Sequence, residues 1–342
     1  MYKVGSLYAG IGGICQAFIN AHSKIAWANE YDKNACITYR LNYNHKLYEE
    51  DIWKLDPLSL EKVDILVAGF PCQPFSVAGY RKGFSDERGN HFYRIIDFIN
   101  ALDKPKAVFL ENVKNLTGHD KGKTFRIIKE AMLANGYSFH AQVLNSKDYG
   151  NIPQNRERIY MVSFRNEEDG SNKYDDYFEF PQPIKLKHSI ADILEKKDVD
   201  ERYYYRSDRY MYKELVASIK RKDTVYQWRR MYVRENQSNV CPTLTANMGT
   251  GGHNVPLILA DNGIRKLTPR ECFLFQGFPK NFKIPKNVGI SQLYKQAGNS
   301  VTVPVIERIA VNIISALDCK VKVEKKIKVK HKGKTLELPS LL

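Results

Sequence analysis

Residues 63–76 read Val-Asp-Ile-Leu-Val-Ala-Gly-Phe-Pro-Cys-Gln-Pro-Phe-Ser. Residues 65–68 form a short apolar run that ends at Gly69 and two prolines, which predicts a buried strand delivering Cys72 to a loop. Because each proline fixes its own φ and restricts the residue before it, the backbone around Cys72 is stiff. A thiol with an ordinary pKa near ~8.5 is the strongest side-chain nucleophile available without a metal. The stretch predicts a nucleophile on a rigid turn, with a small core residue as the alternative.

The composition indicates a polyanionic partner. The 342 residues include 53 Lys and Arg against 38 Asp and Glu, a formal net charge of +15. Nucleic acid suits this excess, because each neutralised phosphate releases counterions, although a basic surface can also serve solubility alone. The length allows one large domain or two.

The cysteine spacing and the hydropathy pattern indicate a cytoplasmic protein. The sequence has six widely spaced cysteines, with no Cys-x-x-Cys pair and no Cys/His cluster at zinc spacing, so we expect reduced thiols and no metal. Residues 4–19 resemble a signal peptide but are interrupted by Gly10, Gly12 and Gly13. We expect no membrane partner, since no apolar run approaches the ~20 residues of a membrane span.

Three segments near the N-terminus end in residue types suited to holding a nucleoside. Residues 3–8 predict a strand, followed by a glycine turn at 9–13 and a helix. A strand over 24–29 ends at Glu30, and a third segment ends at Asp51. In doubly wound folds an acid at such a place binds ribose hydroxyls. From spacing alone, a turn without a ligand, exposed acids and a nicotinamide dehydrogenase all stay open.

Two later strand ends carry charge. Residues 106–110 predict a strand ending at Glu111, on the edge that holds Cys72, because parallel strands joined by crossover helices share one carboxyl edge. The strand over 138–144 and the next strand have no helix between them, so we expect an antiparallel pair that returns Arg158 to this edge. Capping of a turn by Glu111 and a surface ion pair at Arg158 are the alternatives. The pattern predicts an α/β fold with a doubly wound, Rossmann-like sheet, mostly parallel with one antiparallel strand.

The second half of the chain changes character. From residue 166 to 262, tyrosines and basic residues interleave, which suits stacking and phosphate contact but is shared by exposed loops. Residues 320–334 are rich in lysine and form either a phosphate-tracking tail or a solvated extension.

Taken together, these segments resemble the DNA (cytosine-5)-methyltransferases of bacterial restriction–modification systems. The resemblance covers about residues 4–315, and its motifs come in the family's order: residues 7–13, 29–32, 71–76, 88–92, 111–113, 154–158, 242–254, 267–271 and 296–301. Two residues depart from the family pattern. Tyr8 stands where phenylalanine is usual, and His91 stands where an aliphatic residue is usual.

The resemblance implies a set of site residues, with S-adenosylmethionine as cofactor and double-stranded DNA as partner. The implied catalytic residues are Cys72, Glu111, Arg156 and Arg158. The implied cofactor-binding residues are Tyr8, Ala9, Gly10, Gly12, Gly13, Glu30, Tyr31, Asp51, Ile52, Pro71, Asn299 and Ser300. The expected DNA contacts are Ser76, Arg88, Gln227, Arg229, Arg230, Arg234, Thr243, Leu244, Gly251 and Gly252.

The chemistry of cytosine accounts for these residue types. C5 is a poor nucleophile until the Cys72 thiolate adds to C6, while Glu111 supplies a proton to N3 and Arg158 binds O2. A base inside a duplex exposes no face to a thiol, so the target must be flipped out at a cost of a few kcal/mol.

The resemblance also implies a domain plan: a catalytic and cofactor-binding domain (1–165), a target-recognition domain (166–290), a segment packing back on the first domain (291–318) and a basic tail (319–342). We expect a monomer, with a cognate restriction endonuclease acting separately. Two alternatives stay open: a tRNA cytosine-5 methyltransferase of the same fold, and a DNA-binding regulator with a vestigial pocket.

Overall fold

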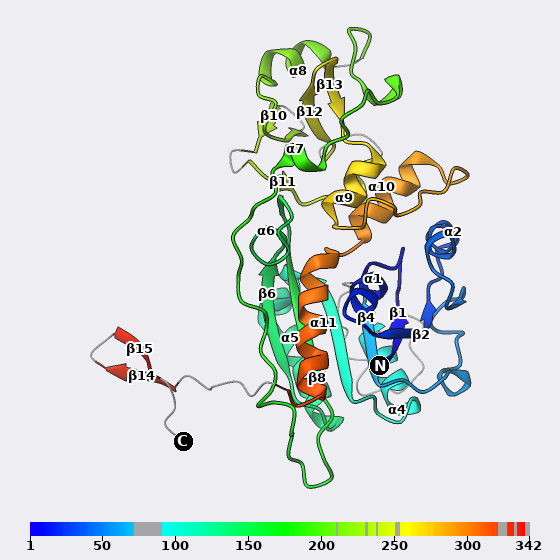
Figure 1. Cartoon of the computed structure of the whole chain (residues 1–342), viewed down its shortest axis with the longest axis vertical. Coiled ribbons are helices and arrows are strands. Elements are labelled where there is room, and N and C mark those ends of the chain that lie inside the picture. The colour runs from blue at the N-terminus through cyan, green and yellow to red at the C-terminus, as the bar shows by residue number, and fades with distance from the viewer. Residues whose placement is uncertain are drawn as a thin grey trace.

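The computed structural model describes residues 1–71, 91–209, 211–229, 232–236, 239–249 and 254–320, together with the backbone of 327–331 and 334–338. Two units lie one above the other in Figure 1, and α11 runs along the lower one.

The lower unit is built on a seven-stranded sheet in the order β3-β2-β1-β4-β5-β8-β6. Its strands are β1 (Lys3–Leu7), β2 (Lys24–Asn29), β3 (Lys46–Tyr48), β4 (Ile65–Gly69), β5 (Ala107–Val113), β6 (His140–Asn145) and β8 (Glu157–Phe164). The neighbours from β3 to β5 are parallel, and β8 is antiparallel to both β5 and β6. The predicted doubly wound sheet with one antiparallel strand is therefore confirmed.

Helices cover both faces of this sheet. They are α1 (Gly13–Asn20), α2 (Lys33–Asn42), α4 (His91–Ala101), α5 (Lys123–Ala134), α6 (Ser146–Tyr149) and α11 (Val303–Leu317), with the 3-10 turns η1 (Pro57–Ser59), η2 (Lys114–Thr117) and η3 (His119–Gly122).

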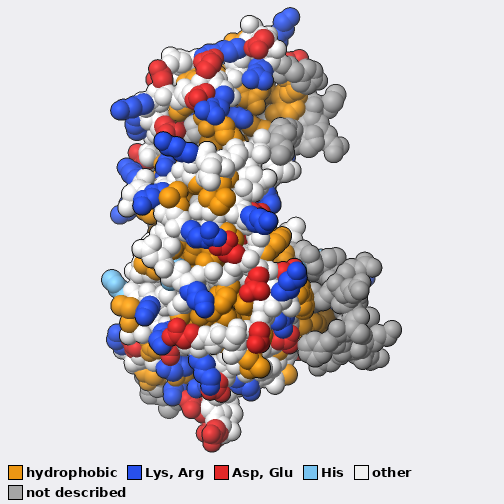
Figure 2. Space-filling model, turned by 90° about the vertical axis from the view of Figure 1, so that its right-hand side faces the viewer, with side chains coloured by type: hydrophobic (Ala, Val, Ile, Leu, Met, Phe, Trp, Pro, Cys, Tyr) orange, Lys and Arg blue, Asp and Glu red, His pale blue; other side chains and the backbone are white. Residues whose placement is uncertain are grey.

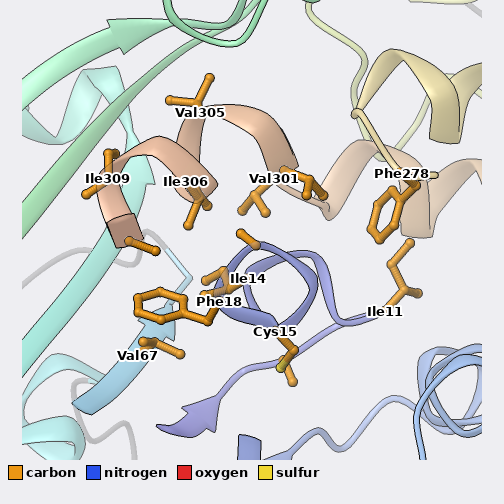
Figure 3. Close-up of a cluster of buried hydrophobic side chains, with 14 of the residues drawn as sticks. Ile11, Ile14, Cys15, Phe18, Val67, Phe278, Val301, Val305, Ile306 and Ile309 are labelled. Carbon is orange, nitrogen blue, oxygen red and sulfur yellow. The ribbon is translucent and has the colours of Figure 1, made fainter. Parts of the chain in front are cut away.

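Strand β4 shows why its sequence is apolar throughout. Side chains alternate across a strand, so Ile65 and Val67 point to the face covered by α1 and α11, while Leu66 and Ala68 point to the face covered by α4 and α5. All four are fully buried. Figure 3 shows Val67 beneath Phe18 of α1, with side chains of α11 above. A parallel strand buried on both faces needs such a continuous apolar run.

The upper unit is smaller and antiparallel. It contains a four-stranded sheet in the order β10-β9-β12-β13. Its elements are α7 (Ile190–Ile193), η4 (Glu201–Tyr203), α8 (Tyr212–Ser218), β9 (Tyr226–Arg229), β10 (Tyr232–Glu235), β12 (Pro256–Ala260), β13 (Gly263–Lys266), α9 (Pro269–Phe275) and α10 (Ile290–Asn299). A short parallel pair, β7 (Gln154–Asn155) with β11 (Cys241–Pro242), joins the units. Towards the C-terminus, β14 (Ile327–His331) pairs with β15 (Lys334–Leu338).

The chain stays on the lower unit beyond the expected boundary at residue 166. Phe178 packs against Phe164 with ring centroids 5.3 Å apart. On α11, the Asn312 amide donates to the Glu179 carbonyl (2.9 Å) and Arg308 donates to the Gln182 carbonyl (2.8 Å). Aromatic burial and these backbone contacts therefore hold residues 178–182 on the first unit.

The stretch Ile290–Leu317 is long and apolar enough, by length and composition alone, to cross a membrane, which corrects the expectation of no such run. In the fold it comprises α10 and α11, and α11 buries its apolar face against α1 (Figure 3). The hydrophobicity of α11 therefore serves the protein core.

The packing of α10 gives a testable prediction. A Cβ on Gly298 would lie 2.2 Å from the Thr245 carbonyl carbon and 2.3 Å from the Ala246 nitrogen, so Gly298→Ala must push two backbone segments apart. We expect it to lower the free energy of unfolding by about 1–3 kcal/mol, as overpacking usually does. Gly289, before the same helix, faces open space, and Gly289→Ala is the control. Thermal unfolding of both variants checks this; equal melting of Gly298→Ala and wild type would contradict it.

Candidate active site

The candidate site lies where the strand order of the seven-stranded sheet reverses. The parallel strands β1 and β4 are neighbours, with β2 beyond one and β5 beyond the other. Loops leaving the carboxyl ends of two such strands diverge and open a crevice, which is where doubly wound folds bind ligands. The glycine turn leaves β1 at this point, and the chain to Cys72 leaves β4.

Glu111 and Arg158 meet at the same edge, as predicted. Glu111 pairs in register with Gly69 of β4, and Arg158 pairs with Val113. Arg158 Nε lies 3.2 Å from Glu111 Oε1, and both side chains are largely buried. Burial raises the pKa of Glu111 above its ordinary value, while the positive charges of Arg158 and Arg156 oppose that shift. The pair thus places a carboxyl group with a raised pKa beside a largely buried guanidinium.

The described chain leads from this pair towards the predicted nucleophile. A Cβ built on Gly69 would lie 3.5 Å from Glu111 Oε2, so the strand end touches the carboxylate. Asn112 then donates from Nδ2 to the Phe70 carbonyl (2.9 Å) and anchors the exit of β4. The first described segment ends at Pro71, and Cys72 lies outside the described residues.

Arg156 sits in a cage of backbone carbonyls. Its Nη1 donates to Leu244 (2.8 Å), and its Nη2 donates to Gly298 (3.1 Å) and Ser300. Only 2 % of the residue is exposed, and its Nε has no hydrogen-bond partner among the described residues. Burial, helped by the charge of Arg158, lowers the pKa of Arg156 to about 9, which leaves it charged at neutral pH. These contacts favour a positioning role over the predicted catalytic one.

Gln154 adds to the contacts that Arg156 makes between the two units, which are called the junction below. It was not among the predicted site residues. Its amide nitrogen donates to the Phe275 carbonyl (2.6 Å), and its oxygen accepts from the Leu244 N–H (3.1 Å). The clue in the sequence was its place in the motif that ends with the two arginines.

Glu30 organises the edge expected to hold the cofactor. Its Oε2 accepts from the Gly10 N–H (2.7 Å), and its Oε1 accepts from the N–H groups of Tyr31 (2.9 Å) and Asp32 (2.8 Å). Burial raises the pKa of Glu30, and the three N–H donors oppose the rise. The carboxylate thus ties the end of β2 to the glycine turn.

The three glycines of the turn serve different purposes. Gly10 has a positive φ of 57° and open space where a Cβ would point, so a ligand can approach it. A Cβ on Gly12 would lie 2.2 Å from the Tyr43 ring, and one on Gly13 would lie 2.9 Å from Ser300 Oγ. Gly12 and Gly13 therefore permit close packing, and Ser300 reaches the turn.

Aromatic rings flank this edge. Tyr31 is 70 % exposed and Trp53 is 43 % exposed, which is unusual for such large rings. Tyr8 is half-buried, and its hydroxyl lies 3.0 Å from His91 Nδ1. The sequence prediction missed Trp53, although an aromatic residue two positions after Asp51 was a usable signal.

The remaining expected cofactor residues differ in accessibility. Asp51, Pro71 and Asn299 are exposed, whereas Ala9 and Ile52 are buried. The buried pair can reach a ligand through backbone groups, while the exposed residues can offer side chains.

The expected DNA contacts fall into three groups. Gln227 and Leu244 are buried. Arg234 is exposed, Arg229 is held by Asn254 Oδ1 (3.0 Å), and the Thr243 hydroxyl donates to the Asn155 carbonyl (2.7 Å). The others lie outside the described residues: Ser76, Arg88, Arg230, Gly251 and Gly252.

The basic side chains do not form a single patch on the face in Figure 2, where Lys and Arg are interspersed with Asp and Glu over both units. The described residues also contain no group of three or more His, Cys, Asp or Glu side chains arranged to hold a metal ion.

Comparison with known proteins agrees with this geometry. The family model described as C-5 cytosine-specific DNA methylase matches residues 2–315. The Type II methyltransferase M.Bsp6I of Bacillus sp. (strain RFL6) is 54% identical over 321 residues, which cover 93% of this chain and 100% of that protein. The Type II methyltransferase M.HhaI of Haemophilus parahaemolyticus is 39% identical, covering 92% of this chain and 94% of that one.

A solved structure extends the likeness to the fold. The S. pombe Dnmt2 methyltransferase matches with a TM-score of 0.71 at 22% identity, covering 93% of this chain and 100% of that one. With the family model matching nearly the whole described chain up to α11, this protein belongs to the C-5 cytosine-specific DNA methylase family.

Proposed function

We propose that this protein transfers a methyl group to C5 of a flipped-out cytosine within a specific sequence of duplex DNA, using Cys72 as nucleophile. The observation that carries the proposal is the buried Glu111–Arg158 pair beside the strand that leads to Cys72. Gly69 pairs with Glu111 across the sheet and precedes Cys72 by three positions in the sequence.

The nucleophile and the acid have complementary tasks. The Cys72 thiolate forms a bond to C6, which makes C5 electron-rich. Glu111 in its protonated form donates to N3, and Arg158 stabilises the charge that develops on O2. C5 would then form a bond to the methyl group as the methyl–sulfur bond of the sulfonium breaks. Transfer of the C5 proton to a base would re-form the C5–C6 double bond and release the Cys72 thiolate. The raised pKa of Glu111 supports this assignment, because an acid must hold its proton near the working pH.

The edge between β1 and β2 would hold S-adenosylmethionine, which supplies the electrophilic methyl group. Open space over Gly10, the exposed Tyr31 ring and the exposed Asp51 carboxylate suit a nucleoside. Glu30 holds the turn in shape and presents its carboxylate to the ribose.

The upper unit would read the DNA sequence. Arg229 and Arg234 on β9 and β10 are the described candidates for contact with DNA, together with the predicted residues outside the described ones. The similarity to Type II methyltransferases supports a restriction–modification role. We propose in addition that the methylase acts in the cytoplasm as a monomer, with a separate endonuclease as partner.

A tRNA substrate is the alternative on the same fold. Transfer of tritiated methyl groups to DNA and to tRNA distinguishes the two, and the family match favours DNA. Bisulfite sequencing of DNA from cells expressing the protein then identifies the target. A DNA-binding regulator with a vestigial pocket would show no transfer to either.

The first prediction concerns the nucleophile. Cys72→Ser should abolish methyl transfer, because a serine hydroxyl is far less nucleophilic than a thiolate near neutral pH. DNA binding should survive, since the flipping pocket and the recognition unit are unchanged. Filter transfer assays and gel-shift titration measure the two properties. Normal methyl transfer by Cys72→Ser would overturn the mechanism.

The second prediction concerns the acid. Glu111→Gln should lower the rate at least ~100-fold, in the range of lost acid–base help. Wild-type activity should fall as pH rises through the raised pKa of Glu111, because the acid then loses its proton, and this fall should be absent in Glu111→Gln. The pH profiles of single-turnover rates measure both effects.

The matched control is Glu157→Gln, a neighbouring carboxylate paired with Lys114 at the surface (2.9 Å). It should keep the wild-type profile, because a surface ion pair contributes little. If the activity of Glu111→Gln falls with rising pH as that of the wild type does, Glu111 is not the acid.

A further inference from the structure

The two departures from the family pattern, Tyr8 and His91, contact each other. The Tyr8 hydroxyl lies 3.0 Å from His91 Nδ1, and the rings meet edge to face with centroids 5.4 Å apart. Tyr8 directly follows β1 and has a positive φ of 54°, which is uncommon for a residue with a side chain. His91 is the first residue of α4. Its ring nitrogen at 3.0 Å, and its backbone carbonyl at a longer 3.4 Å, join this helix to the hydroxyl of a residue 83 positions earlier.

A third ring extends this contact towards Asp51. The Trp53 ring lies 6.0 Å from the His91 ring, and Arg94 lies over Trp53 at 5.8 Å. Arg94 also donates to the carbonyl groups of Ile52 (3.1 Å) and Leu55 (2.8 Å), which fixes the loop carrying Trp53. Tyr8, His91 and Trp53 therefore form a continuous aromatic wall between the glycine turn and the Asp51 loop.

We propose that Tyr8 and His91 are positioning residues that act as one hydrogen-bonded unit and set the affinity of this wall for the adenosine part of the cofactor. This inference rests on the cofactor site proposed above. Either residue by itself could offer a ring to the ligand. Removing the Tyr8 hydroxyl takes this partner away from His91 Nδ1, and removing the His91 ring leaves the hydroxyl with only its longer 3.4 Å contact to the backbone carbonyl of residue 91. The affinity should therefore depend on the pair and not on the sum of its members.

The electrostatic surroundings keep the pair intact at neutral pH. Burial lowers the pKa of His91, and the Asp51 carboxylate opposes the shift. Burial raises the pKa of Tyr8, with Arg94 and Asp51 acting in opposite directions. Both groups are thus neutral, and a neutral hydroxyl and a neutral imidazole can hydrogen-bond in either tautomer.

A double-mutant cycle tests the proposal. Calorimetric titration with S-adenosylhomocysteine is carried out on Tyr8→Phe, His91→Leu and the double variant. Each single change should weaken binding of the nucleoside about 5- to 20-fold, because it removes the 3.0 Å hydrogen bond from a half-buried polar group that stays in place. The apolar double variant should bind within about 2-fold of wild type. In steady-state assays the KM for S-adenosylmethionine should follow these changes, while the KM for DNA stays constant.

The control for hydroxyl removal is Tyr137→Phe. Tyr137 is fully buried and donates to the Pro105 carbonyl (2.8 Å), remote from the glycine turn. This variant should lose stability without losing cofactor affinity. Additive weakening in the Tyr8/His91 double variant, or wild-type binding by both single variants, would overturn the proposal.

A further variant separates failure of this inference from failure of the proposed function. Glu30→Ala removes the acceptor of three N–H groups and should abolish binding if the cofactor lies at this edge. If Glu30→Ala abolishes binding while the Tyr8 and His91 variants bind normally, the site stands and the paired role falls. If none of the variants changes binding, the proposed cofactor site itself is wrong.

Discussion

The buried guanidinium of Arg156 is the constraint on which the arrangement of the two units depends. Burying a charge is costly unless its hydrogen bonds are satisfied, and here the acceptors are backbone carbonyls of Leu244, Gly298 and Ser300. Backbone acceptors cannot rotate away as side chains can. The loop carrying Leu244, the end of α10 and the segment before β8 are therefore held together around this one side chain.

This junction also explains why the motif around residues 154–158 contains two arginines with different surroundings. Arg156 points into the junction, whereas Arg158, two residues later on the chain, meets Glu111. One short segment thus connects the junction between the two units with the Glu111–Arg158 pair. A shift of the upper unit would pull on the strand that carries Arg158.

The electrostatics of the catalytic edge follow from burial on both sides. Glu111 lies at the end of a strand covered by helices on both faces, which raises its pKa, yet a guanidinium beside it limits the rise. Glu30, at the end of β2, is equally buried but is surrounded by backbone N–H donors. The two carboxylates, on β5 and after β2, thus have different partners, one suited to proton donation and the other to holding a turn.

Much of this organisation was readable in the sequence because its signals are local or periodic. The apolar run 65–68, the glycine turn and the lack of a long helical pattern before Arg158 predicted the sheet, its antiparallel strand and the meeting of Glu111 with Arg158, all of which the structure confirms. The expectation of no helix between the last two strands was wrong, because the four-residue helix α6 lies there, but it is too short to make a crossover. Apolar patterning sets which strands are buried, and connection length sets their direction.

The tertiary structure alone decided contacts between residues far apart in the chain. The carbonyl cage of Arg156, the packing role of Gly12 and Gly13 and the pairing of Tyr8 with His91 depend on backbone groups and packing distances that no local pattern encodes. The same holds for residues 172–184, whose polar composition suggested the second unit but whose aromatic side chains complete the core of the first. The sequence by itself determined the fold class and the chemistry at the strand ends. Only folding decided which side chains bind the ligand and which hold the units together, because that choice depends on which distant groups become buried beside one another.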